Sequence, residues 1–289
     1  MPGRPTLLAV AHGTRAAAGV ATTEALLARV RALRPDLRVE CCYLDLASPA
    51  LPEALARLRG AVVLVPLLLG TGYHHRVDIP AAVAAEPRPQ ARIARPLGPH
   101  PLLAAALTDR LYAAGWRPRA PRSALVLAAA GSTDPAAGVD TAAMAALLRE
   151  HLPGRPPVVP ANLCGAGPSP AEAVTALRAA GHRQVAVAEY LLGPGFFARR
   201  AAASGACLTS APLGAHDALA RLVVLRYQEA LASPALASAT PVPFPAAPIA
   251  ATPVPSAALA PAPVASAALA TPPVPSAPLV ATPVPSAPV

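Results

Sequence analysis

The amino-acid sequence contains one series of landmarks twice, and this internal duplication limits the possible folds more than any other feature. The landmarks recur in the same order and at nearly the same spacing in two halves of the chain. The matching segments are residues 7–14 with 124–132, 49–54 with 168–173, 68–73 with 191–196, and 96–100 with 212–216. Such a repeat indicates two copies of one folding unit.

Each copy alternates short apolar runs with helical patterns. The strands expected in the first copy are residues 6–11, 37–44, 61–69 and 91–95. The helices expected between and after them are residues 22–33, 48–58, a short helix beyond Pro80, and 100–114. Strands that alternate with helices form parallel βαβ units. We therefore predict an α/β protein of two duplicated, flavodoxin- or Rossmann-like lobes, each with a parallel sheet flanked by helices.

The two copies and the sequence beyond them give three predicted regions. Residues 1–118 form the first lobe and carry the candidate site, whereas residues 119–231 form a second lobe without the site histidines. Residues 232–289 contain no charged side chain, consist mainly of Ala, Pro, Val, Ser and Thr, and repeat the run ATPVPSA. This composition favours polyproline II and cannot form a packed core, so we expect a disordered tail.

The composition argues against several classes of protein. No continuously apolar run reaches the ~18 residues that a membrane-spanning helix needs, and the first residues show no signal pattern, so a cytoplasmic protein is expected. The cysteines have no CxxC spacing, which argues against a disulfide framework or a thiolate metal site. The net charge of +9 suits a polyanionic ligand, but with 3% aromatic residues the stacking that single-stranded nucleic acid requires is poorly supported.

Polar side chains follow the expected strands of the first copy. His12 follows the first strand and Asp45 the second, and His74 and His75 follow the third after the turn at residues 70–72. Ligands of open α/β sheets bind at the carboxyl ends of the strands. Imidazoles and a carboxylate at one edge suit a divalent transition metal such as Fe, Co, Ni or Zn. We expect His12 and His74 to bind the metal, with Asp45 and His75 as candidate additional members of the site.

The second copy lacks these polar groups. The positions that correspond to His12, Asp45, His74 and His75 hold Ala130, Cys164, Phe197 and Ala198. Residues that the fold requires should recur in both copies, so the polar set indicates a site that the first lobe holds and the second closes. His100 does recur, as His216. Both of these are therefore expected to be structural, at the amino ends of helices.

Two motifs of the first copy resemble those of a known enzyme family. HGTR stands at residues 12–15, and GYHHRVDIP at residues 72–80. They resemble the patterns H-G-[ST]-R and G-x-H-x-x-x-D-I-P of the sirohydrochlorin chelatases, which are class II tetrapyrrole chelatases. YLDLASP at residues 43–49 is also similar, with Asp45 where the family usually has Glu. The resemblance covers roughly residues 5–230, in the two-lobed form of the family.

The resemblance implies insertion of Co²⁺ or Fe²⁺ into sirohydrochlorin without ATP, on the route to cobalamin or sirohaem. It makes His12 and His74 the catalytic, metal-binding pair, which would also accept protons from the pyrrole nitrogens. Sirohydrochlorin is rich in carboxylates, and four arginines flank the expected cleft and could hold them: Arg15, Arg76, Arg199 and Arg200. The expected partners are sirohydrochlorin and the metal ion, with no nucleic acid, no membrane and no further cofactor, and the expected state is a monomer.

Two other functions would use the same residues. A non-enzymatic carrier of metal or tetrapyrrole would bind through the same histidines without accelerating insertion. A phosphohistidine enzyme with His12 as nucleophile would need an arginine directly before it, but the chain has Ala11 there. The chelatase is therefore the favoured prediction, and the carrier is the alternative.

Overall fold

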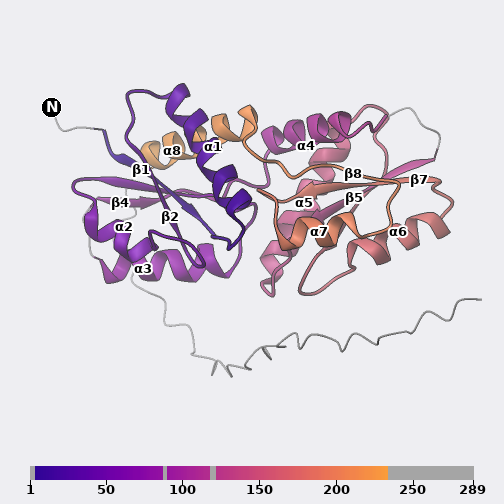
Figure 1. Cartoon of the computed structure of the whole chain (residues 1–289), viewed down its shortest axis with the longest axis horizontal. Helices are drawn as coiled ribbons and strands as arrows, with labels where there is room; N and C mark the ends of the chain where they lie inside the picture. The colour runs from indigo at the N-terminus through magenta and orange to yellow at the C-terminus, as the bar shows by residue number, and fades with distance from the viewer. Residues whose placement is uncertain (1–3, 87–89, 118–121, 234–289) are drawn as a thin grey trace, which may run out of the picture. The chain divides into compact units, whose positions relative to one another are not determined.

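The computed structural model of the chain describes residues 4–86, 90–117 and 122–233 (Figure 1). The predicted tail lies almost wholly outside the described residues. Within these ranges strands and helices alternate along the chain, and the strands form two separate sheets.

The first sheet has four parallel strands in the order β2-β1-β3-β4. They are β1 (Thr6–Ala11), β2 (Val39–Tyr43), β3 (Val62–Pro66) and β4 (Ala91–Ile93). In the centre of the sheet Ala9 pairs with Cys41 on one side and with Val65 on the other. The β1 side chains are buried on both faces, because alternate residues enter different core clusters.

The second sheet repeats this arrangement with the order β6-β5-β7-β8, again parallel throughout. Its strands are β5 (Ser123–Ala129), β6 (Val158–Asn162), β7 (Gln184–Tyr190) and β8 (Leu208–Thr209). The topology of the two sheets is the same, strand for strand. The predicted duplicated α/β fold is therefore confirmed, whereas no observation tests the predicted domain boundaries.

Helices follow the strands in both copies. Those of the first copy are α1 (Ala17–Leu33), α2 (Leu51–Arg57), the π-helix η1 (His74–Asp78), α3 (Ile79–Ala85) and α4 (Pro101–Ala113). Those of the second are α5 (Pro135–His151), α6 (Pro170–Ala179), α7 (Phe196–Ala202) and α8 (Asp217–Ala232). Helix α1 begins earlier than predicted, because the alanine-rich residues before Thr22 favour a helix although they add little to its apolar stripe.

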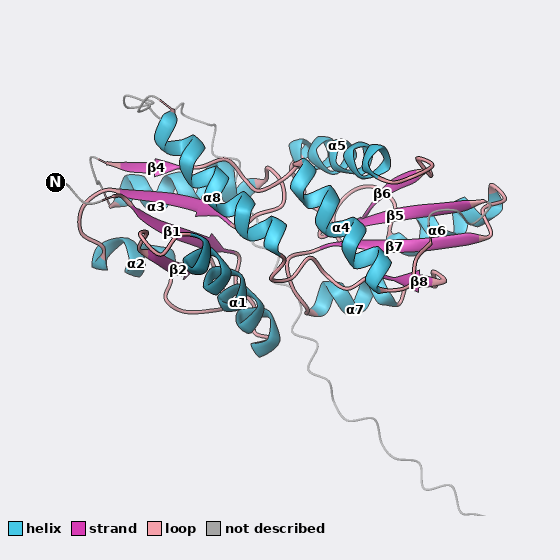
Figure 2. Cartoon of the chain, turned by 90° about the horizontal axis from the view of Figure 1, so that it is seen from above, coloured by secondary structure: helices cyan, strands magenta, loops and turns pink. Residues whose placement is uncertain are grey.

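The last helix of each copy packs against the other copy. Helix α8 contacts α1, β3 and β4 of the first lobe, whereas α4 contacts α5 and β7 of the second (Figure 2). The largest core cluster accordingly includes residues of both sheets and both exchanged helices. The two lobes thus share a hydrophobic core and lie within one compact unit.

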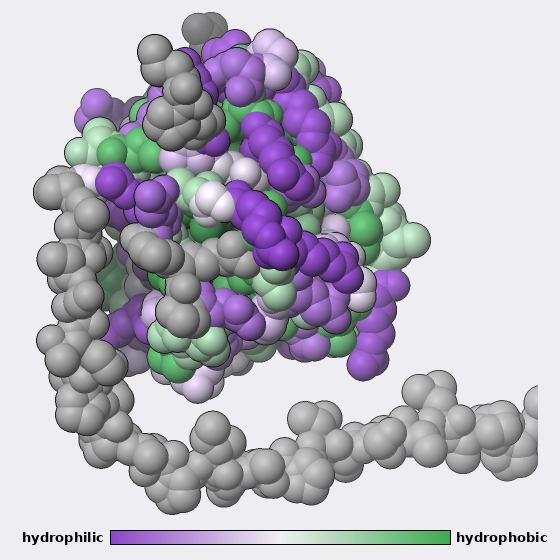
Figure 3. Space-filling view, turned by 90° about the vertical axis from the view of Figure 1, so that its left-hand side faces the viewer, coloured by the Kyte–Doolittle hydropathy of each residue, from purple (hydrophilic) through white to green (hydrophobic). Residues whose placement is uncertain are grey.

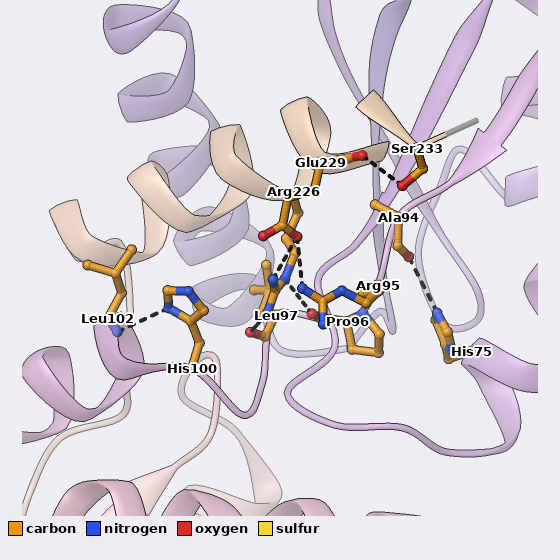
Figure 4. A network of polar contacts seen from close by, with 10 residues as sticks. All are labelled: His75, Ala94, Arg95, Pro96, Leu97, His100, Leu102, Arg226, Glu229 and Ser233. Atoms are coloured by element: carbon orange, nitrogen blue, oxygen red, sulfur yellow. Dashed lines mark hydrogen bonds and ion pairs between the residues drawn. The ribbon is translucent and has the colours of Figure 1, made fainter. Parts of the chain in front are cut away.

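An arginine at the same place in each exchanged helix holds it to the opposite copy. Arg226 of α8 donates from Nε to the carbonyl oxygen of Pro96 at 2.8 Å and from Nη2 to that of Leu97 at 2.9 Å (Figure 4). Arg110 of α4 donates from Nε and Nη2 to the carbonyl oxygen of Leu213 at 3.0 and 2.8 Å. These bonds satisfy backbone carbonyls that would otherwise be left unpaired when the helix packs over them.

Histidines cap both exchanged helices at their amino ends. Nδ1 of His100 accepts from the backbone N–H of Leu102, and Nδ1 of His216 accepts from that of Ala218, each at 3.1 Å. A ring nitrogen here does what a serine or aspartate oxygen does at other helix starts. The predicted structural role of this pair is confirmed.

On the first-lobe end shown in Figure 3, hydrophilic residues cover most of the surface toward the viewer, and hydrophobic residues are scattered among them. Within the described parts of the chain, no helix combines the length and the hydropathy needed to cross a membrane.

Candidate functional site

A cavity of about 650 Å³ lies between the two lobes, at the carboxyl ends of strands from both sheets. The first lobe lines it with residues that follow β1 and β3, including His12 and the segment 68–75. The second lobe lines it with residues that follow β5, β6 and β7, and with the start of α5. Most of these residues are apolar or small, so the few polar groups among them determine what chemistry the cavity can support.

The rings of His12 and His74 meet at the first-lobe wall of this cavity. Their centroids are 4.7 Å apart and the ring planes are inclined by 77°. His12 comes directly after β1 and His74 begins η1, so adjacent parallel strands bring the two residues to the same edge of the sheet. Neutral imidazoles are common ligands of divalent transition metals, and two at this separation can contact one ion.

Asp78 fixes the orientation of the His74 ring. Nδ1 of His74 lies 2.5 Å from Oδ2 of Asp78, one turn farther along the chain. An ionised carboxylate only accepts hydrogen bonds, so this contact places the proton on Nδ1 and leaves the lone pair on Nε2. Carboxylates hold metal-binding histidines in this way in many metal sites.

Asp78 lies within the motif at residues 72–80, and no role was predicted for it. The predicted helix begins only beyond Pro80. A helix that began at His74 would have brought this residue to Asp78 through the spacing of four residues. The segment forms a π-helix rather than an α-helix, and irregular turns of this kind are frequent at functional sites.

His75 also lines the cavity, but its ring is turned toward β4. Its Nε2 lies 3.4 Å from the carbonyl oxygen of Ala94 (Figure 4). Its Nδ1 is buried and has no hydrogen-bond partner in the described part of the chain. Burial lowers the pKa of His75, so the ring is uncharged near neutral pH. The carbonyl oxygen accepts from Nε2–H, which leaves the lone pair on the buried Nδ1, so the ring must turn before it can bind a metal in the cavity.

Asp45 lies outside the cavity. Its carboxylate Oδ1 accepts from the backbone N–H of Leu46 at 2.7 Å, and its own N–H donates to the carbonyl oxygen of His12 at 2.9 Å. Among the described residues, no three His, Cys, Asp or Glu side chains are grouped to hold a metal. Asp45 therefore supports the turn that carries His12, and within the described part of the chain the histidine pair has no third ligand of these types beside it.

The four arginines expected to bind carboxylates do not form the wall of the cavity. None of Arg15, Arg76, Arg199 and Arg200 is among the described residues that line it. Arg76 of η1 forms an exposed ion pair with Asp134 at the start of α5, with Nη1 3.4 Å from Oδ2. Arg200 lies over the ring of Phe196, 5.7 Å from its centroid. A carboxylate of a bound ligand could reach Arg76 only in competition with Asp134.

The second lobe presents apolar or weakly polar groups where the first presents histidines. Ala130 and Phe197 line the cavity at the positions that correspond to His12 and His74. Cys164, which corresponds to Asp45, also lines it, and its Sγ lies 3.0 Å from the carbonyl oxygen of Ala130. The cavity thus has one wall with paired imidazoles and one that offers a largely apolar surface.

Known proteins resemble this chain in sequence and in fold. A sirohydrochlorin ferrochelatase from Priestia megaterium is 29% identical over 197 residues, which cover 65% of this chain and 73% of that protein. A sirohydrochlorin cobaltochelatase from Methanococcoides burtonii is 26% identical over 120 residues, which cover 36% of this chain and 92% of that protein.

A solved structure, SirB from Bacillus subtilis with Fe³⁺, superposes with a TM-score of 0.66 at 26% identity. The superposition covers 79% of this chain and 96% of SirB. The CbiX family model matches the chain twice, at residues 6–114 and again at residues 124–230. These two matches coincide with the two copies seen in the sequence and in the sheets, and the chain therefore belongs to the CbiX family.

Proposed function

We propose that this protein inserts a divalent metal ion, Co²⁺ or Fe²⁺, into sirohydrochlorin. The observation that carries the proposal is the contact between the His12 and His74 rings at the wall of the cavity. The two relatives named as sirohydrochlorin chelatases support the choice of substrate. Cobalt and iron make the same demands on imidazole ligands, so both remain in the proposal, as do cobalamin and sirohaem synthesis as the pathways served.

The chemistry of insertion matches what the two histidines can do. When the metal enters the macrocycle, two pyrrole N–H bonds break and two protons leave, and the four ring nitrogens form bonds to the metal. His12 and His74 would hold the ion before transfer and accept a proton afterwards, since an imidazole that releases a metal is a base with a free lone pair. Asp78 would keep Nε2 of His74 directed at the reacting atoms.

The rest of the cavity would bind and orient the macrocycle. The apolar second-lobe wall, with Phe197, suits a flat aromatic face. The carboxylates at the rim of the macrocycle would meet arginines around the cavity, Arg76 foremost because η1 carries both this residue and His74. Arg15, Arg199 and Arg200 are proposed for the same role.

We propose further that the reaction uses no ATP and no cofactor besides the metal, which is itself a substrate. The chain is expected to act as a monomer, because one chain supplies both walls of the cavity. The cytoplasmic location and the lack of nucleic-acid and membrane partners remain predictions from the sequence.

The test is the absorbance change of sirohydrochlorin with Co²⁺ or Fe²⁺, without oxygen and without ATP. His74→Ala should slow protein-dependent insertion at least about 100-fold, as expected for loss of a proton-accepting metal ligand. His216→Ala is the control, because His216 caps helix α8 and does not line the cavity. This variant should leave the rate unchanged. A His74→Ala protein that inserts metal at the parent rate would refute the site. A parent protein that binds both substrates without accelerating insertion would be a carrier.

A further inference from the structure

The loop that carries His74 is held from the opposite lobe. This loop, residues 69–73, connects the end of the first-lobe strand β3 to His74. Tyr190 at the end of β7 donates from its hydroxyl to the carbonyl oxygen of Leu69 at 2.5 Å. Tyr190 is 3% exposed, so this hydrogen bond is largely shielded from competing water. It fixes the backbone at the start of the loop.

A second residue of the same lobe holds the next part of the loop. The backbone N–H of Thr71 donates to Oδ2 of Asp140, in the second turn of α5, at 2.6 Å. A Cβ atom at Gly70 would lie 3.4 Å from Cβ of Asp140, which shows how closely the loop approaches this helix. A carboxylate acceptor makes a stronger hydrogen bond to a backbone N–H than a neutral oxygen does.

The symmetry of the fold shows that neither contact is needed to build a lobe. Helices α1 and α5 match residue for residue, which places Thr22 where α5 has Asp140. In the other loop Pro194 takes the place of Thr71 and has no N–H to donate.

Thr22 does lie against the matching glycine, since a Cβ atom at Gly193 would be 3.3 Å from its methyl carbon. Its hydroxyl, however, donates back to Ala18 within its own helix. Leu67 stands where β7 has Tyr190 and has no hydroxyl. Both polar contacts therefore occur only on the side where the loop leads to a histidine.

We infer that Tyr190 and Asp140 are positioning residues that hold His74 beside His12, so that the lobe without the site histidines sets the geometry of the metal pair. The inference rests on the proposed role of His74 as a metal ligand. Two ligands bind one ion tightly only when their separation is fixed before the ion arrives. Only two residues separate Thr71 from His74, and loss of either contact would let the two rings move apart.

The experiment measures Co²⁺ binding to the whole chain by calorimetry, with cobalt chloride as the probe and no tetrapyrrole. Tyr190→Phe and Asp140→Ala should each weaken Co²⁺ binding about three- to tenfold, the loss expected for one hydrogen bond of this kind. Asp140→Asn keeps an oxygen acceptor and should recover most of the affinity. The matched control is Tyr227→Phe, because the buried Tyr227 hydroxyl donates to the carbonyl oxygen of Pro5 at 2.6 Å, outside the cavity wall. This control should bind Co²⁺ as the parent does.

Equal Co²⁺ affinities of Tyr190→Phe, Asp140→Ala and Tyr227→Phe would overturn the inference. If His74→Ala alone abolishes binding in that experiment, the proposed function survives and the positioning role does not. If His74→Ala binds Co²⁺ like the parent, both fail. Combining Tyr190→Phe with His74→Ala separates positioning from general damage, because a residue that acts through His74 should cause no further loss of affinity once His74 is absent.

Discussion

The two lobes have the same fold but carry different residues at the carboxyl ends of their strands. Comparing them separates the residues that the fold requires from those that the site requires. Strand order, helix exchange, arginine anchors and histidine caps are the same in both. Gly13 and its counterpart Gly131 have φ angles of 100° and 89°. A Cβ atom there would come within 1.7 Å of the Asp45 carbonyl oxygen and 1.9 Å of the Cys164 carbonyl oxygen. Only glycine fits at these two positions, because each combines a positive φ angle with a close approach of another backbone segment.

The carboxyl edges of the two sheets differ in the polar groups proposed for the site. Where the first lobe has His12 and His74, the second has Ala130 and Phe197 and still forms the same sheet. The imidazoles are therefore not required for folding. In a duplicated scaffold one copy can lack these polar residues. It then lines the opposite side of the cavity and holds the loop that carries His74.

The largest expected difference between the lobes is in their response to pH. Glu189 of β7 is 3% exposed, and one of its carboxylate oxygens has no partner within the described residues. The corresponding position in the first lobe holds Pro66, which has no ionisable group. Burial raises the pKa of Glu189 from 4.5 to about 7. Between these values the native protein binds a proton that the unfolded chain releases, so stability falls as the pH rises through this range, by at most about 3 kcal/mol.

The test is the free energy of unfolding in urea between pH 4.5 and pH 8. Glu189→Gln keeps the shape of the side chain without its charge, so this part of the decrease with pH should disappear and the variant should be the more stable protein at pH 8. A variant with the same pH profile as the parent would show that Glu189 is hydrated or paired in solution.

A smaller effect would sharpen the difference between two imidazole–carboxylate pairs found among the described residues, His74 with Asp78 and His216 with Asp109. Asp78→Asn should weaken Co²⁺ binding about 10- to 100-fold, because a neutral amide accepts more weakly than a carboxylate and can also donate, so it holds the proton on Nδ1 of His74 less firmly. Asp109→Asn is the matched control, since Oδ2 of Asp109 lies 3.2 Å from Nε2 of His216, a helix-capping histidine. Equal Co²⁺ affinities of the two variants would contradict the role given to Asp78.

The smallest effect tests the equivalence of the capping histidines. His100→Ala and His216→Ala should each lower the free energy of unfolding by about 1 kcal/mol, the usual cost of losing a helix cap. Burial lowers the pKa of His100, so its ring is neutral and its Nδ1 can accept at pH 7. Denaturant unfolding measures both losses. Weaker Co²⁺ binding by His100→Ala would contradict a purely structural role.

The sequence was sufficient to predict the features that depend on local pattern. Apolar, β-branched runs predicted the strands, and β1 has the predicted bounds. The proximity of His12 and His74 could also be predicted, because the ends of neighbouring parallel strands meet at one edge whatever the details of the loops. Comparing the two copies removed His100 from the candidates, and its cap shows why.

The remaining features depend on contacts that no local pattern encodes. An apolar helix face shows that α4 and α8 pack on a sheet but not on which one, so the exchange of these helices could not be predicted. The role of Asp78 depends on the π-turn of η1, and a sequence that fits both α- and π-geometry does not distinguish them. Asp45 follows a strand as His12 does, yet its carboxylate turns back to the N–H of Leu46.

The central claim is that the first lobe alone holds the metal, between His12 and His74. Anomalous scattering from crystals soaked in Co²⁺ tests it most directly. We expect one strong peak within bonding distance of both rings, on the side of the His74 ring opposite Asp78, and its loss in His74→Ala crystals. A peak on the second-lobe wall, at Cys164 or near Phe197, with none between the two histidines would contradict the account.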